Sequence, residues 1–253
     1  MIKIEKADVY GWEAAIRGMR NPKNSWDKSD SYDVFYSAVD EDTFYECREQ
    51  GEIPKSAVYG KYCPNDNTTF LLGENDLKLM QTLAKAGSDH GKFLRMINVT
   101  VDLTAPLYWW KEFDTYKVGT VADSCSTMHK LTAKEFELSD FSFEHLTEGA
   151  IEDVAKPIIS VLNGAREAYL NYEKYTEQDP EGWDAGITCK KDVWWQMIQL
   201  LPSSYNQKRT VQLNYQVLKS MYFARRDHKL DEWHDFCAWC ESLPYFKEIC
   251  IDG

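Results

Sequence analysis

A stretch of alternating apolar side chains constrains the fold of this chain more than any other feature. Residues 96–103 read Met-Ile-Asn-Val-Thr-Val-Asp-Leu, and their β-branched side chains favour a strand over a helix. One face of that strand carries Ile97, Val99, Val101 and Leu103. Pro106 comes next and suits the first turn of a helix, where its missing N–H costs nothing. The chain is therefore expected to form a sheet whose apolar face is covered by helices.

The remaining patterns predict further helices and few strands. A strand is expected at residues 2–9 and a short extended segment at 210–213. Asn75 is a plausible N-cap for a helix that Gly87 ends, and Pro157 should kink a long helix over residues 147–175. Other helices are expected at residues 12–19, 107–114, 193–200, 215–226 and 230–243.

Three segments lack such periodicity. Residues 21–31 and 119–130 read as loops, the second a connecting or functional one, and residues 35–72 give no clear pattern. The 253 residues can form one large domain, so we expect a single domain over residues 1–253. We expect an α/β (α+β) fold, with an antiparallel or mixed central sheet flanked by long helices.

Charge and composition narrow the class of partner. The formal net charge is −12, which argues against surfaces for nucleic acid or anionic membranes. A small anionic ligand needs only a local pocket of positive charge. No run of eighteen apolar residues and no signal-peptide core is present, so we expect a cytoplasmic protein. Seven scattered cysteines, an odd number, indicate reduced thiols.

Some residues allow a chemical interpretation beside a structural one. Cys237 and Cys240, with His234 and Cys250, could suggest zinc, but the helical pattern favours core packing, and we expect no metal site. Cys125 could be a nucleophile, although no base is identifiable near it in the sequence. The aromatic runs 108–110 and 194–195 could be ring-stacking platforms, and core or interface packing is the commoner outcome.

The C-terminal part of the chain carries a family resemblance. Leu201-Pro202, then Asn214 at a helix start, then Arg225 three turns along, resemble the flavin-dependent thymidylate synthases. The spacing has a physical reason, because Asn214 lies beside free helix N–H groups and Arg225 projects from the same helix with a two-pronged donor. Taken alone, Asn214 could be only an N-cap and Arg225 only a solvated charge.

A second stretch resembles the same family in order but not in signature. His90, the strand, Ala105-Pro106 and a helix follow the family's order. The family's Arg-His-Arg then falls on Thr115-Tyr116-Lys117, or on residues 116–118 with a one-residue slip. Arg95 stands where the family usually has Glu. Positive charge lost with the family's arginines could be replaced by Lys61, Arg95, Lys117 or Arg226.

The resemblance implies an enzyme that binds FAD and a pyrimidine deoxynucleotide monophosphate. It would use methylenetetrahydrofolate and NADPH as co-substrates to transfer a one-carbon unit to the pyrimidine C5, as in conversion of dUMP to dTMP, and it would be a homotetramer. The resemblance assigns catalytic roles to Lys117 and Asp123, substrate contacts to Arg225, Thr120, Ser124 and Ser126, and cofactor contacts to His90, Arg95, Tyr116 and Asn214.

Two alternatives stay open on the same fold. A carboxylate at Asp123 that faces the ring would accept hydrogen bonds from an exocyclic amine, which favours dCMP and a hydroxymethylase. Asp123 could equally be a turn residue. The missing arginines could instead mean a nucleotide-binding paralogue without turnover.

Overall fold

The computed structural model describes residues 1–35, 41–50, 57–58, 68–126, 131–178 and 186–253. Contacts between residues divide the chain into two compact units. The smaller unit contains Met1 and residues 104–113 and 124–209, and the larger unit contains residues 2–103, 114–123 and 210–253. The division falls within three strands of the main sheet. A single domain over the whole chain stays a prediction.

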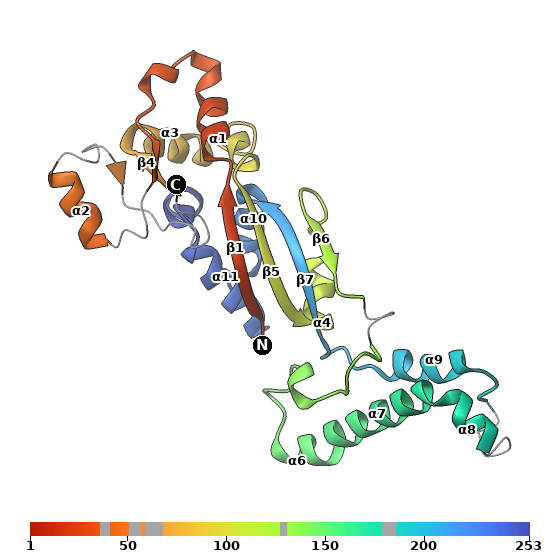
Figure 1. Ribbon diagram of the computed structural model, residues 1–253. Helices are drawn as coiled ribbons and strands as arrows, with labels where there is room; N and C mark the ends of the chain where they lie inside the picture. The colour runs from red at the N-terminus through yellow and green to blue at the C-terminus, as the bar shows by residue number, and fades with distance from the viewer. Residues whose placement is uncertain (36–40, 51–56, 59–67, 127–130, 179–185) are drawn as a thin grey trace. The chain divides into compact units, whose positions relative to one another are not determined.

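The main sheet has four strands in the order β1-β5-β7-β6. They are β1 (Lys3–Tyr10), β5 (Asn98–Pro106), β7 (Asn206–Asn214) and β6 (Val121–Ser124). The Tyr215 N–H donates to Ile97 O at 3.0 Å, and Thr210 Oγ1 donates to Asp102 Oδ1 at 2.7 Å. Residue numbers rise on β7 as they fall on β5, so these two strands are antiparallel, as their arrows in Figure 1 show.

A second sheet of three strands belongs to the larger unit, in the order β2-β4-β3. Its strands are β2 (Tyr32–Phe35), β4 (Thr68–Gly73) and β3 (Ala57–Val58). Both pairings are antiparallel, with Tyr32 opposite Leu71 and Ala57 opposite Gly73. These strands and α2 (Glu41–Glu49) lie in or beside the stretch for which the sequence offered no clear pattern.

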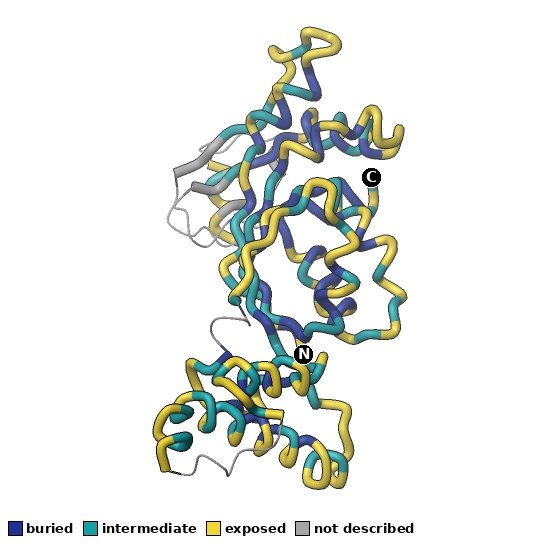
Figure 2. Tube along the Cα trace, turned by 90° about the vertical axis from the view of Figure 1, so that its right-hand side faces the viewer, coloured by how far each residue is buried: buried dark blue, intermediate teal, exposed yellow. Residues whose placement is uncertain are grey.

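Helices cover one face of the main sheet in the larger unit. These are chiefly α10 (Tyr215–Arg225) and α11 (Asp231–Ser242), which Figures 1 and 2 both place on the same side of β1 and β5. The expected alternation along β5 is confirmed, since Val99, Val101 and Leu103 are buried and the residues between them are half-buried. The largest fully buried side chains of the helices on this face are Tyr215, Trp233 and Phe236.

The helix expected after Asn75 is α3 (Glu74–Lys85), but Asn75 is not its cap. The helix begins one residue earlier, and the Asp30 carboxylate accepts hydrogen bonds from the Asn75 and Asp76 N–H groups at 3.0 and 3.2 Å. A side chain distant in sequence therefore accepts hydrogen bonds from the free N–H groups of the first helical turn. The prediction of Asn75 as N-cap is wrong. Gly87 comes after the helix with φ of 101°, as expected for a glycine stop.

The smaller unit is built on a helix pair, α7 (Lys156–Leu170) packed against α9 (Lys190–Leu200). Its core consists of Leu131, Phe136, Phe141, Ile159, Leu162 and Met197. The predicted long helix over residues 147–175 is interrupted, since a π-helical turn, Ile151–Ala155, precedes α7 and α8 (Tyr172–Gln178) comes after it. Pro157 stands in the first turn of α7, a position that tolerates its missing N–H.

Two further expectations differ from the structure. Residues 119–130 are not all loop, because β6 occupies four of them as an exposed strand beside β7. The extended segment at residues 210–213 is the end of a longer strand, β7. The helices expected at 12–19, 107–114 and 230–243 are confirmed as α1 (Trp12–Arg20), α4 (Leu107–Phe113) and α11. None of the described helices is long and apolar enough to cross a membrane.

Candidate functional site

A cavity of about 500 Å³ lies in the larger unit where three segments meet. Arg95 ends the short helix η3 (Gly91–Arg95), residues 115–119 form a loop, and Asn214 begins α10. The volume is within the range of small-molecule sites in proteins. The residues that line the cavity are Arg95, Thr115, Tyr116, Lys117, Val118, Gly119, Asn214, Gln216, Val217 and Ser220.

The start of α10 is fixed by backbone and side-chain hydrogen bonds. Asn214 ends β7, and its side-chain oxygen accepts from the Val217 N–H at 3.1 Å. The next residue, Tyr215, is fully buried and donates its N–H to Ile97 O at 3.0 Å. The prediction that Asn214 caps this helix is confirmed. The partial positive charge of the helix start therefore lies at the cavity in a rigid position.

Gly119 brings the loop at residues 115–119 against α10. Its φ is 81°, in the left-handed region that favours glycine. A Cβ atom at this position would lie 3.1 Å from Val217 Cγ2 and 3.2 Å from Asn214 Nδ2. The close approach of loop and helix therefore favours glycine, and the same loop places Tyr116 and Lys117 on the cavity wall.

The cavity is positively charged although the chain as a whole is acidic. Arg95 and Lys117 are exposed at its wall, and neither forms an ion pair or hydrogen bond within the described parts of the chain. The described residues that line the cavity include no carboxylate. Amides of Asn214 and Gln216 and three hydroxyl groups add uncharged hydrogen-bonding groups. Such a set suits an anionic ligand with polar edges, for instance one that carries a phosphate.

Four of the ten predicted site residues therefore meet at this cavity. They are Arg95, Tyr116, Lys117 and Asn214. Arg225 is not among the lining residues: its Nε donates to the Tyr116 hydroxyl at 2.9 Å, and its guanidinium lies 4.8 Å from the Trp233 ring centroid. The structure thus shows Arg225 in contact with a residue of the wall.

The other predicted site residues are not among those that line the cavity. His90 is exposed just before η3, and Asp123 is exposed on β6. Thr120 is next to Gly119, and its Oγ1 is buried without a hydrogen-bond partner in the described chain. Ser124 and Ser126 belong to the smaller unit, and their part in substrate binding stays a prediction.

Two of the four candidate replacement charges reach the cavity, Arg95 and Lys117. Arg226 is exposed and pairs with Asp227 at 3.4 Å. Lys61 lies outside the described residues.

Sequence reasoning did not find the helix wall of the cavity. Gln216 and Ser220 are four residues apart on α10, and Val217 lies between them on the same face. The sequence signal that could have indicated this wall is the polar face of the helix, which lies beside the buried side chains of Leu218 and Met221.

The cysteines and tryptophans singled out in the sequence are mostly core residues. Cys237, Cys240 and Cys250 are buried, which raises the pKa of Cys237 to about 11 and that of Cys250 to about 12. Core packing of the first two is therefore confirmed. Trp109 and Trp110 are also buried, whereas Trp195 is 40% exposed. In the described part of the chain, no group of His, Cys, Asp and Glu could hold a metal ion.

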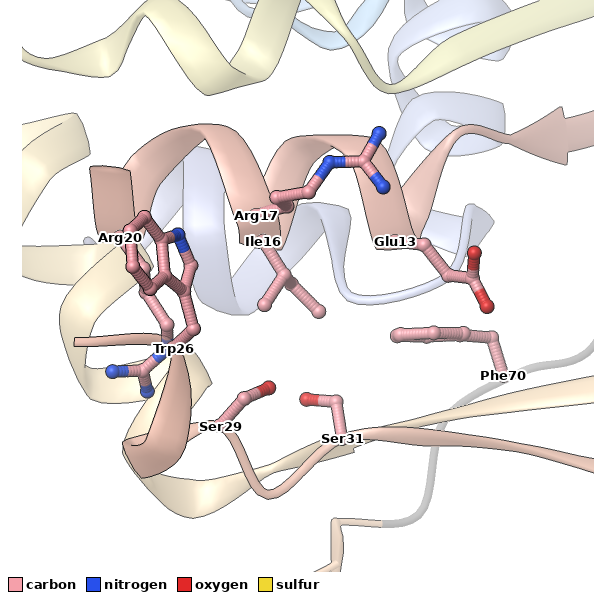
Figure 3. A pocket seen from close by; sticks show the side chains of 8 residues that line it. All are labelled: Glu13, Ile16, Arg17, Arg20, Trp26, Ser29, Ser31 and Phe70. Carbon is pink, nitrogen blue, oxygen red and sulfur yellow. The ribbon is translucent and has the colours of Figure 1, made fainter. Parts of the chain in front are cut away.

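A second cavity of about 330 Å³ lies beside α1 in the larger unit. Figure 3 shows Trp26 and Phe70 at opposite ends of it, with Ile16 between them. Its wall is held by the buried ion pair of Arg20 with Asp76, 2.7 Å long. Asp76 also accepts hydrogen bonds from the Ser29 and Ser31 hydroxyls and the Asp30 N–H. Because these polar groups satisfy one another, this cavity offers fewer unpaired donors than the first.

Comparisons with known proteins point to one fold. No protein-family model and no curated protein matches the chain. Two solved structures of the flavin-dependent thymidylate synthase ThyX from Helicobacter pylori, each with FAD and dUMP, are similar to it. The first has a TM-score of 0.57 and 15% identity, and covers 99% of this chain and 98% of that chain. The second has a TM-score of 0.57 and 14% identity, and covers 100% and 98%. The predicted α+β architecture is thereby confirmed, and the chain shares the fold of these enzymes.

Proposed function

We propose that the protein is a flavin-dependent enzyme of the thymidylate synthase type, which transfers a one-carbon unit from methylenetetrahydrofolate to C5 of a pyrimidine deoxynucleotide. The observation that carries the proposal is the cavity, since residues matched to the family by sequence order alone lie together on its wall. The fold shared with two structures that contain FAD and dUMP supports it.

The residues present fit a ligand that carries phosphate. Arg95 and Lys117 supply cationic donors without a described carboxylate partner, and the α10 start supplies the positive end of a helix. In this proposal Arg95, Tyr116, Lys117 and Asn214 hold FAD or the nucleotide phosphate.

FAD, when bound and reduced by NADPH, supplies the hydride that a methylation of this kind requires. The chain's own part is to bind, orient and polarise. Lys117 stabilises negative charge at the cavity, and Asp123, with Thr120, is assigned to the polar edge of the pyrimidine. His90 keeps its proposed role in cofactor binding.

The proposal includes assembly as a homotetramer of single-domain chains in the cytoplasm. Exposed apolar side chains on the helices of the smaller unit support self-association: Val154, Val161, Leu170, Trp195 and Leu200. Six cysteines of the described chain are free, which suits a reducing compartment. Light scattering on the purified protein would give the oligomeric state, and a monomer would remove the tetramer from the proposal.

Spectroscopy tests the cofactor and the site together. The purified protein should bind FAD, and dUMP should perturb the flavin absorbance bands. Arg95→Gln and Lys117→Gln should each weaken binding of one of these ligands about tenfold, because each removes a charge-assisted contact. Lys85→Gln is a matched control, since Lys85 is an exposed lysine of the same unit that does not line the cavity. A protein that binds no flavin at saturating concentration would overturn the proposed function.

Release of tritium from C5 of labelled nucleotide tests the reaction. Comparison of dUMP with dCMP, each with methylenetetrahydrofolate and with or without NADPH, identifies both substrate and outcome. Release from dUMP that needs NADPH supports methylation, and release from dCMP without NADPH would support hydroxymethylation. Ligand binding without release from either nucleotide would indicate the paralogue without turnover.

A further inference from the structure

Arg225 occupies an aromatic cage immediately behind the cavity wall. The cage consists of the Tyr116 and Trp233 rings beside the Arg225 guanidinium, and His228 packs against Trp233. The guanidinium carbon lies 4.8 Å from the Trp233 ring centroid and 5.5 Å from that of Tyr116. The Trp233 ring meets the rings of Tyr116 and His228 edge to face, each at 6.3 Å between centroids. Trp233 is fully buried, so the cage has a rigid base.

The hydrogen bond between Arg225 and Tyr116 has a defined direction. Arg225 Nε can only donate, so the Tyr116 hydroxyl accepts at 2.9 Å and keeps its own hydrogen for another acceptor. No described residue accepts that hydrogen. Tyr116 lies on the cavity wall, next to the two cations that have no described partner. The hydroxyl hydrogen is therefore available to a ligand in the cavity.

We infer that the Tyr116 hydroxyl is a third donor to the anionic group of the ligand, beside Arg95 and Lys117, and that Arg225 is a positioning residue that acts through Tyr116. The inference rests on the proposed function, which identifies the anionic group as a phosphate of either the nucleotide or the flavin. It replaces the direct contact between Arg225 and substrate that the family resemblance implies.

The chemistry of the cage supports this division of roles. A tyrosine on a surface loop has two rotatable side-chain bonds, and a contact from behind fixes where its hydroxyl lies. Arg225 can fix it because its planar guanidinium lies close to Trp233 while Nε faces the hydroxyl. Lysine has a carbon atom at the position of the arginine Nε. Arg225→Lys therefore keeps the positive charge and loses the hydrogen bond from Nε to the Tyr116 hydroxyl.

A double-mutant cycle separates positioning from direct contact. Inorganic phosphate, dUMP and FAD are titrated separately against the parent, Tyr116→Phe, Arg225→Lys and the double variant. Tyr116→Phe should weaken binding of the phosphate-bearing ligand about tenfold. Arg225→Lys should weaken it by a similar or smaller factor. The double variant should be no weaker than Tyr116→Phe alone, because both changes remove the same donor.

A matched control is available one residue further along the chain. Arg226 also stacks on an aromatic ring, at 5.2 Å from the Phe223 centroid, but its ion pair is with Asp227 and it does not line the cavity. Arg226→Lys should leave phosphate affinity unchanged. Thermal denaturation of every variant identifies any that fails to fold, and deoxyuridine, which lacks phosphate, should bind parent and variants equally.

Each outcome of the cycle supports or overturns the inference. Additive losses in the double variant would place Arg225 directly on the ligand and overturn the inference, as would unchanged affinity in Tyr116→Phe. A chain that binds inorganic phosphate with the expected cycle, but neither dUMP nor FAD, would support the inference and reject the proposed function. A ¹³C-tyrosine signal, assigned to Tyr116 by its loss in Tyr116→Phe, should shift on addition of phosphate; no shift with any of the three ligands would also overturn the inference.

Discussion

Gly119 is the position at which one methyl group should disturb the cavity most. Gly119→Ala forces a residue with a Cβ atom into φ of 81°, which costs about 1–2 kcal/mol. The new Cβ atom would also lie 3.1 Å from Val217 Cγ2 and 3.2 Å from Asn214 Nδ2, which adds about 1 kcal/mol of crowding. The smaller entropy of the unfolded alanine chain offsets about 0.5 kcal/mol. The expected loss of unfolding free energy is therefore about 2 kcal/mol.

Two other glycines provide controls for the two components of this loss. Gly87 has φ of 101°, but a Cβ atom there would meet nothing within 4 Å, so Gly87→Ala measures backbone strain without crowding. Gly164 lies within α7 with open space around it, so Gly164→Ala should stabilise the protein by about 0.5–1 kcal/mol. The difference between Gly119→Ala and Gly87→Ala isolates the contact of the loop with α10.

Urea denaturation followed by circular dichroism measures all three variants under the same conditions. The expected order of stability is Gly164→Ala, parent, Gly87→Ala and Gly119→Ala. Gly119→Ala should also weaken phosphate binding, because Asn214 and Val217 must move to admit the methyl group. If Gly119→Ala is as stable as Gly87→Ala and binds phosphate normally, Gly119 does not hold the loop at residues 115–119 against α10, and the reasoning is refuted.

Three further predictions concern buried groups and the helix start. Asp76→Asn should lower the unfolding free energy in urea by about 3–5 kcal/mol, because it leaves the buried Arg20 guanidinium without its counter-charge. Asn214→Ala should cost about 1 kcal/mol through loss of the cap, whereas Asn214→Asp should keep stability and weaken phosphate binding by placing an anion in the cavity. Tyr222 donates to Glu241 at 2.6 Å, and this hydrogen bond raises the Tyr222 pKa to about 12. The protonated Tyr222 hydroxyl stabilises the fold fully below about pH 10, and this contribution is lost as the pH rises towards 12. Between about pH 9.5 and about pH 11.5, the melting temperature of Tyr222→Phe should therefore fall less steeply than that of the parent.

Local features of the fold could be predicted from the sequence because their causes are local. The alternation along β5, the cap at Asn214 and the buried face of α11 each depend on residues within a few positions of one another. The wrong prediction at Asn75 has the opposite cause. Its helix is capped by Asp30, 45 residues earlier in the chain, and no pattern near Asn75 indicates that contact.

In the candidate site, too, the sequence did not predict contacts between residues that are far apart along the chain. Order along the chain was enough to nominate Arg95, Lys117 and Asn214, which the structure brings to one cavity. The partner of Arg225 could not be inferred, because Tyr116 lies 109 residues away and the contact depends on how loop and helix pack. The role of Gly119 was also missed, since a single glycine in a polar loop gives no sign of the side chains it must approach.

A strand passes directly into a helix at the edge of this site. Asn214 is the last residue of β7 and Tyr215 the first of α10, and Pro106 and Leu107 form a similar junction between β5 and α4. Each residue added to a helix rotates the later side chains by about 100° around its axis. A single insertion after Asn214 would therefore swing Gln216 away from the cavity, whereas exposed positions such as Val118 can change identity freely. Evolution of this site can therefore proceed by substitution, while a change of length between Asn214 and Tyr215 would displace the helix wall of the cavity.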